Sequence, residues 1–213
     1  MTSTQVSTMV SPGTKSFLIL LLFFSCFSLA AQQLQEGDLL FCCSDSVNAI
    51  TAVTSGVEDL PIDHVAVVHR LGGEDGPLFV VEAVKPEVCL TPIDTFMMNN
   101  GTVLVGRVNV DCDVTASVSR CLAMLGKPYD DLYLLGDSAV YCSELVQKNY
   151  LDADGQLIFE PIPMSFHDKT GKVTQFWKDY YARKGFQVPE GCPGSNPGDL
   201  SRSPKLRFLF SFR

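Results

Sequence analysis

Residues 37–110 carry short apolar runs separated by polar turns. The runs are rich in valine, leucine and phenylalanine, which is typical of strands buried in a sheet. We expect strands at residues 37–42, 64–69, 78–84, 88–90 and 102–110. The turn sequence Gly72-Gly73-Glu74-Asp75-Gly76-Pro77 predicts that the second and third of these strands pair as a hairpin. Short helical segments are expected at 47–53 and 92–98.

Helical spacing replaces this pattern after residue 113. Apolar residues recur on one face from Val114 to Leu125, and Gly126 ends the run. Further helices are predicted at 142–150 and 173–184, and the Pro- and Gly-rich segment from Val188 onward is expected to wrap the surface. Because strands form one block and helices the next, we predict an α+β fold with an antiparallel sheet packed against helices.

Composition narrows the class of protein. A chain of 213 residues suits one domain, and 46% hydrophobic with 19% charged residues can form a continuous core. The formal net charge is −8, and no basic run is present to neutralise phosphates. Nucleic acid is therefore not expected as a partner.

The first 30 residues are typical of a signal peptide. A polar lead with Lys15 precedes the apolar run Phe17–Phe24, and Ser28-Leu29-Ala30 fits the small-x-small cleavage rule. We expect residues 1–30 to be removed, residues 31–213 to form a single domain, and the protein to be periplasmic or secreted. The run is shorter than the roughly 20 residues that cross a bilayer, so no stable span is expected after cleavage. Alternatives that keep the protein attached to a membrane are an uncleaved anchor and acylation at Cys26.

Seven cysteines remain after this cleavage. None belongs to a CxxC pair and the three histidines are scattered, so we predict neither a metal site nor a cofactor. An odd number in an exported protein is consistent with one free reactive thiol and up to three disulfides. Buried reduced thiols are an equally open interpretation. The seven are Cys42, Cys43, Cys89, Cys112, Cys121, Cys142 and Cys192.

Cys142 and His64 are the candidate nucleophile and base. Cys142 opens a predicted helix, where the backbone dipole favours a thiolate and free N–H groups can stabilise an oxyanion. His64 begins a predicted buried strand. His69 is five residues further along and is predicted to face the opposite side, with an exposed polar flank, while His167 lies in a polar loop. Taken alone, either candidate also fits a structural role.

A catalytic histidine needs a group that orients its ring, and Glu82 is the candidate. It interrupts the apolar run Phe79–Val84, and folding the hairpin about Gly73–Gly76 brings it near His64. Asp63 is the alternative, although neighbouring residues in a strand point to opposite faces.

Five segments, taken in order, resemble a known family. They are Gly37-Asp38-Leu39-Leu40-Phe41, Asp63-His64-Val65-Ala66-Val67-Val68, Val80-Val81-Glu82-Ala83, Gly126-Lys127-Pro128-Tyr129-Asp130 and Tyr141-Cys142-Ser143-Glu144-Leu145-Val146. Together they are similar to the permuted papain-like cysteine hydrolases of the YiiX/YebB/YaeF group, relatives of NlpC-type cell-wall peptidases and of lecithin:retinol acyltransferase. The resemblance covers about Gly37 to Leu206 and implies a circularly permuted papain-like fold, in which the histidine strand precedes the cysteine helix.

The same resemblance implies the roles of the residues. Cys142 matches the nucleophile, His64 the base and Glu82 the orienting group, with Asp63 as a rival for that last role. The pair Cys42-Cys43 departs from the family and is interpreted as a disulfide partner or a second thiol. The hydroxyl groups of Tyr129 and Tyr141 are candidates for the oxyanion site or the cleft wall, with simple packing as the other interpretation.

These interpretations predict an exported amidase or peptidase that hydrolyses a peptide or cell-wall fragment through a thioester. Two alternatives remain. The same triad can act on a lipid ester or thioester or transfer an acyl group, with the aromatic cluster near one face of the third helix lining an acyl groove rather than packing on the core. The domain can also bind a ligand without catalysis. The aromatic cluster is Phe176, Trp177, Tyr180 and Tyr181.

Overall fold

The computed structural model of the chain describes residues 33–73 and 75–213. The chain divides into two units between Leu34 and Gln35, and the fold described here is that of Gln35–Arg213. The predicted signal peptide at residues 1–30 lies outside the described residues. Within the described part of the chain, no helix is both long enough and apolar enough to cross a membrane.

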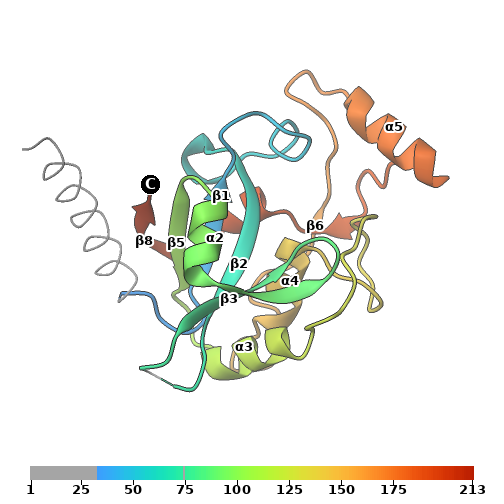
Figure 1. Cartoon of the computed structure of the whole chain (residues 1–213). Helices are drawn as coiled ribbons and strands as arrows, with labels where there is room; N and C mark the ends of the chain where they lie inside the picture. The colour runs from blue at the N-terminus through green and yellow to red at the C-terminus, as the bar shows by residue number, and fades with distance from the viewer. Residues whose placement is uncertain (1–32, 74) are drawn as a thin grey trace, which may run out of the picture. The chain divides into compact units, whose positions relative to one another are not determined.

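A six-stranded antiparallel sheet forms the centre of the fold (Figure 1). Its strand order is β4-β3-β2-β1-β5-β8, so the first strand lies in the middle and the last strand at one edge. The strands are β1 (Leu39–Cys43), β2 (Ile62–Arg70), β3 (Leu78–Ala83), β4 (Val88–Pro92), β5 (Val103–Val108) and β8 (Leu206–Phe212). A two-stranded sheet pairs β6 (Ile162–Pro163) with β7 (Pro193–Gly194).

Helices alternate with the strands along the chain, and α2, α3, α4 and α6 contact the main sheet. Among them, α4 contacts β2 and β3, whereas α3 contacts α4 and β2. The helices are η1 (Val57–Asp59), α2 (Ile93–Asn99), α3 (Val114–Leu122), α4 (Cys142–Asn149), α5 (Gln175–Lys184) and α6 (Pro197–Ser201). The α+β prediction with an antiparallel sheet is therefore confirmed.

The main core lies where α4 meets the central strands. Leu39 and Phe41 of β1, Val65 and Val67 of β2, and Leu145 of α4 are fully buried in one cluster. Their alternation along β1 and β2 gives one apolar face, onto which α4 packs. A second cluster, separate from the first, joins α5 to the segment before it and contains Met164, Phe166, Trp177 and Tyr181.

Two local predictions are wrong. Residues 47–53 form turns rather than a helix, because the Asn48 side chain accepts hydrogen bonds from the backbone N–H groups of Ile50 and Thr51, at 2.9 and 3.0 Å. The C-terminal segment does not simply wrap the surface. Leu206–Phe212 forms β8, which pairs with β5 and completes the main sheet.

Candidate active site

Cys142 is the first residue of α4. The preceding residue, Tyr141, has extended backbone angles (φ −104°, ψ 170°), and its backbone N–H donates to the carboxylate of Glu144 at 3.4 Å, which marks the helix start. The first backbone N–H groups of a helix have no intrahelical acceptor. Cys142 is only 4% exposed, so its sulfur lies beside these donors in a site that is largely shielded from water.

His64 lies on β2, and its Nε2 atom is 2.8 Å from Oε2 of Glu82 on β3. The strand register explains this contact. Val67 pairs with Val81, so Glu82 is one step further toward His64, on the same face of the hairpin. The side chains of His64 and Glu82 are 17% and 9% exposed. The expectation that the hairpin brings these two groups together is confirmed.

Glu82 is held from a second side by Thr91. The Thr91 hydroxyl donates to Oε1 of Glu82 at 2.6 Å, so each carboxylate oxygen has its own partner. Because Glu82 pairs with Cys89 across β3 and β4, Thr91 lies two residues further along β4 on the same face. Burial raises the pKa of Glu82, but the hydrogen bonds and charge of His64 and the Thr91 bond outweigh burial and hold it below its ordinary value.

The structure also brings Cys142 close to this pair, because the Cys142 thiol acts, together with Glu82, on the pKa of the His64 ring. Burial lowers the pKa of His64. The interactions of the ring with Cys142 and with Glu82 outweigh that effect and raise the pKa of His64 to about 10. At neutral pH the imidazole in this setting carries a proton between a sulfur and a carboxylate.

Asp63 does not contact the His64 ring. Its carboxylate accepts a hydrogen bond from the side chain of Asn48 at 2.5 Å, on the other face of β2. The structure therefore gives Glu82, and not Asp63, the position beside the imidazole. His69, expected to be exposed, is largely buried and pairs with Glu36 at 2.8 Å, while His167 pairs with Glu190 at 3.0 Å.

A narrow pocket of about 30 Å³ opens on Cys142. That volume holds about one water molecule, so the pocket is nearly filled by its own walls. The lining side chains are mainly aromatic and aliphatic, and α5 contributes Trp177. The lining includes Ile50, Val53, Tyr129, Tyr133, Tyr141, Met164, Phe166 and Trp177, together with Ser195 and Asn196.

The tyrosines have distinct positions in this pocket. The Tyr141 hydroxyl accepts a hydrogen bond from the backbone N–H of Ser195 at 3.0 Å, and the Ser195 hydroxyl bonds to that of Ser143 at 3.0 Å. The start of α4 is thereby tied to the segment before α6. The Tyr129 and Tyr133 rings meet edge to face with centroids 6.3 Å apart, and burial raises the pKa of both, that of Tyr133 to about 12. All three hydroxyls are therefore neutral at physiological pH.

Sequence reasoning missed Thr91, Tyr133 and Ser195. The spacing of Thr91 from Glu82 becomes informative only when the register of β3 and β4 is known. Tyr133 adopts a positive φ of 53° in a loop, and Ser195 is 53 residues beyond Cys142, so neither carries a local signal. The aromatic residues of α5 were noted, and the structure shows Trp177 and Tyr181 both buried in the second cluster, with Trp177 also lining the pocket.

Every cysteine in the described residues is a free thiol, which favours the interpretation of buried reduced thiols over disulfides. Cys42 lies opposite His64 on β1. Within the described part of the chain, no group of three or more histidine, cysteine, aspartate or glutamate side chains is arranged to hold a metal ion.

Comparison with known proteins agrees with this geometry. The family described as "permuted papain-like amidase enzyme, YaeF/YiiX, C92 family" matches residues 33–210. The crystal structure of the metalloprotein YiiX from Escherichia coli O157:H7 is similar in fold, with a TM-score of 0.67 and 24% sequence identity over 84% of this chain and 97% of that one. No curated protein matched the chain. The histidine strand β2 precedes the cysteine helix α4, which is the permuted order. The chain therefore belongs to the permuted papain-like amidase family of YaeF and YiiX, and is an enzyme of the cysteine amidase and peptidase type.

Proposed function

We propose that the chain is an exported hydrolase that cleaves an amide bond of a peptide or peptidoglycan fragment, with Cys142 as nucleophile, His64 as acid and base, and Glu82 as the orienting group. The observation that carries the proposal is one imidazole that is hydrogen-bonded to a carboxylate and lies close enough to a buried cysteine for that thiol to act on its pKa. Cysteine hydrolases combine these three groups: the carboxylate orients the imidazole, and the imidazole activates the thiol.

In the first half of the reaction the Cys142 thiolate attacks the amide carbon. The carbonyl oxygen becomes an oxyanion, which the free N–H groups at the start of α4 stabilise. The C–N bond then breaks, and the proton of the His64 imidazolium goes to the nitrogen, so that an amine leaves and an acyl thioester remains on the sulfur.

In the second half a water molecule attacks the thioester carbon, and neutral His64 takes one proton of the water as the C–O bond forms. The C–S bond then breaks, so that a carboxylic acid is released and the Cys142 thiolate and His64 imidazolium are restored. Glu82 keeps the ring in one orientation throughout, and Thr91 keeps Glu82 from rotating. Two residues outside the reacting pair thus hold the geometry that both steps need.

The decisive experiment compares the Cys142→Ala protein with the Cys192→Ala protein. Substrates are a panel of acylated peptide amides and a digest of peptidoglycan fragments, followed by amine release and mass spectrometry. Cys142→Ala should reduce hydrolysis by about four orders of magnitude or more. Cys192 does not line the Cys142 pocket, so its variant should keep the activity. Hydrolysis that survives in Cys142→Ala would exclude this sulfur as the nucleophile.

A lipid ester or thioester is the second candidate substrate class. The observation in its favour is the apolar lining of the Cys142 pocket, in which Ile50, Val53, Phe166 and Trp177 meet. Such a wall suits an acyl chain. Measuring acid release from lipid esters and amine release from peptide amides with the same enzyme preparation decides between the two. Activity on neither, in a protein whose Cys142 is also unreactive, would favour a binding domain.

Export is the remaining part of the proposal, and it is supported by the apolar run Phe17–Phe24 and the site Ser28-Leu29-Ala30. Cell fractionation of the full chain, followed by N-terminal sequencing, tests it. We expect the mature protein to begin near Ala31. A protein that keeps Met1 in the membrane fraction indicates an uncleaved anchor, and a blocked N-terminus at Cys26 indicates a lipoprotein.

A further inference from the structure

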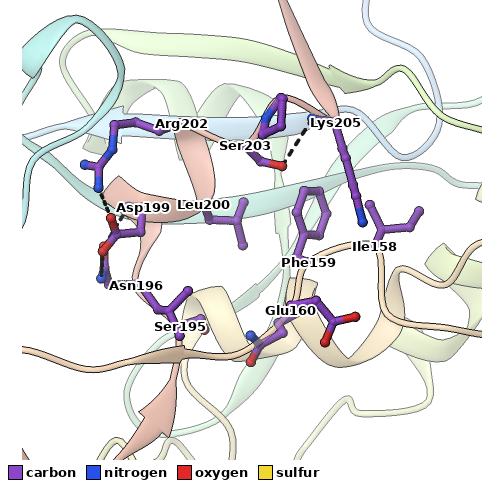
Figure 2. A pocket seen from close by; sticks show the side chains of 13 residues that line it. Ile158, Phe159, Glu160, Ser195, Asn196, Asp199, Leu200, Arg202, Ser203 and Lys205 are labelled. Atoms are coloured by element: carbon purple, nitrogen blue, oxygen red, sulfur yellow. Dashed lines mark hydrogen bonds and ion pairs between the residues drawn. The ribbon is translucent and has the colours of Figure 1, made fainter. Parts of the chain in front are cut away.

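A second cavity, of about 360 Å³, lies next to the Cys142 pocket (Figure 2). Ser195 and Asn196 line both, so one short segment of chain separates the cavity from the proposed catalytic centre. Its size is at the lower end of the roughly 300–1,000 Å³ of small-molecule sites. Its apolar walls include Ile158, Phe159 and Leu200. No step of the proposed reaction uses this cavity.

Gln147 of α4 lines the cavity, but its side-chain amide lies beneath the cavity surface. The residue is 1% exposed, and its Nε2 atom donates to the carbonyl oxygen of Gly194 at 3.4 Å. Because a carbonyl only accepts, the amide must keep its nitrogen on that side. Its Oε1 atom is then left buried, without a hydrogen-bond partner among the described residues. An unpaired buried acceptor is costly, so Gln147 adds strain to this wall, while the groups that a ligand can reach are the charged and apolar side chains of the lining.

Two opposite charges in the lining have no ion-pair partner in the described part of the chain, Lys205 and Glu160. Figure 2 shows the Lys205 side chain extending toward Ile158 and Phe159, with Glu160 on the other side of Phe159. The other two charged lining residues, Asp199 and Arg202, pair with each other. The half-buried ammonium and the exposed carboxylate are therefore the charges that a ligand can neutralise.

We propose that this cavity binds a short peptide in its zwitterionic form. The peptide carboxylate contacts Lys205, its ammonium faces Glu160, and an apolar side chain packs on Ile158, Phe159 and Leu200. The assignment of this peptide as the part of the substrate beyond the cleaved bond, or as a product, rests on the proposed function. The proposal that the peptide binds in this cavity does not depend on the proposed function.

The test is an NMR titration of the full-length Cys142→Ala protein with three dipeptide probes. Glycyl-leucine carries both charges, glycyl-leucinamide lacks the carboxylate, and N-acetyl-glycyl-leucine lacks the ammonium. We expect glycyl-leucine to shift the signals of Ile158 and Leu200 in a saturable way. Loss of the carboxylate should weaken binding about tenfold or more, because Lys205 is half-buried. Loss of the ammonium should weaken it about two- to fivefold, because Glu160 is exposed.

Variants then assign each charge to its residue. Lys205→Met should bind glycyl-leucinamide and glycyl-leucine with equal affinity. Glu160→Gln should bind N-acetyl-glycyl-leucine and glycyl-leucine with equal affinity. Lys178→Met, an exposed lysine of α5, is the matched control and should keep both differences. Circular dichroism checks that each variant is folded. We expect both variants to fold, because neither Lys205 nor Glu160 is fully buried.

Three outcomes would overturn the proposal. They are the absence of saturable shifts, equal affinity of the unmodified protein for all three probes, and shifts confined to Tyr129 and Trp177 around residue 142. A failure of the proposed function is a separate result. Because the Cys142→Ala protein cannot form a thioester, peptide binding in the cavity is measured whether or not the enzyme cleaves amides.

Discussion

Cys42 on β1 and His64 on β2 are directly opposite one another in the sheet. Cross-strand partners project to the same face, so a second thiol lies beside the imidazole that contacts Cys142. Cys42 is 1% exposed. Burial, together with the charges of Asp63, Glu82 and Cys142, raises the pKa of Cys42 well above its ordinary value. Cys42 is therefore held as a neutral thiol, although it lies beside the same imidazole as Cys142.

The first prediction is selective alkylation. Brief exposure to limiting iodoacetamide at neutral pH should label Cys142 before any other cysteine and leave Cys42 unlabelled, because a thiol with a raised pKa holds little thiolate. Burial also raises the pKa of Cys43, Cys89 and Cys112, so these compete poorly. Peptide mapping by mass spectrometry gives the order. Early labelling of Cys42 would contradict this assignment, and the Cys142→Ala protein serves as the control.

The second prediction concerns Glu82→Gln and pH. Replacing the carboxylate by a neutral amide removes a negative charge that favours the protonated imidazole, so the pKa of His64 should fall from about 10 by about 1–3 units. The alkaline limb of kcat/KM should move to lower pH by the same amount. NMR titration of the His64 ring, with and without the substitution, measures the shift directly.

The His64–Glu82 interaction also makes the free energy of unfolding depend on pH, in a direction that follows from the raised pKa of His64. The pKa of His64 is raised from 6.5 to about 10 on folding, so its contribution is complete below pH 6.5 and is lost as the pH rises through about 10. The unfolding free energy of the unmodified protein should decrease over that interval more than that of Glu82→Gln. Parallel urea titrations at several pH values compare the two, and identical pH dependence would argue against the His64–Glu82 interaction.

Thr91→Val tests the hydrogen bond that holds Glu82. The substitution removes the hydroxyl that donates to Glu82 and nearly preserves the side-chain volume. We expect kcat/KM to fall about fivefold, since a hydrogen bond of this kind contributes about 1 kcal/mol, and the alkaline limb of the pH profile to shift. Thr115→Val, at an exposed position on α3, is the matched control. A loss of activity with an unchanged pH profile would point to packing rather than to the orientation of Glu82.

Tyr141→Phe tests the tie between α4 and the segment before α6. The buried N–H of Ser195 would lose its acceptor, so the free energy of unfolding should decrease by about 1–3 kcal/mol. Urea unfolding measures this value. Tyr180→Phe is a useful comparison because its hydroxyl bonds the Asp131 carbonyl at a less buried position, and its loss should cost less. Equal stabilities for Tyr141→Phe and the unmodified protein would contradict the role of this hydroxyl.

The hairpin that carries His64 and Glu82 was predictable because its signals are local. A nearly unbroken β-branched run, a glycine-rich turn and a single acidic residue in the returning strand lie within about 20 residues of one another. The position of Cys142 at a helix start was also predictable. The contact of its sulfur with the imidazole was not, since it depends on how α4 packs against β2 and β3.

The failures have physical reasons that are equally specific. At 47–53 the Asn48 side chain competes with helical hydrogen bonds, and composition alone does not reveal that competition. For the C-terminal segment, the alternation of Leu206, Phe208, Phe210 and Phe212 with other residues was a period-two signal that the preceding prolines and glycines obscured. Its partner, β5, lies about 100 residues earlier, so no local rule identifies the pairing.

The permuted order of the elements also affects how the reactive group assembles while the protein folds. His64 and Glu82 are 18 residues apart and meet within one hairpin, whereas Cys142 reaches them only when a helix 60 residues beyond Glu82 docks. Closing a short loop has a smaller entropic cost than closing a long one. A partly folded chain that keeps the hairpin but has α4 undocked thus holds a formed acid–base pair without its thiol. Reactivity appears only once this long-range contact forms.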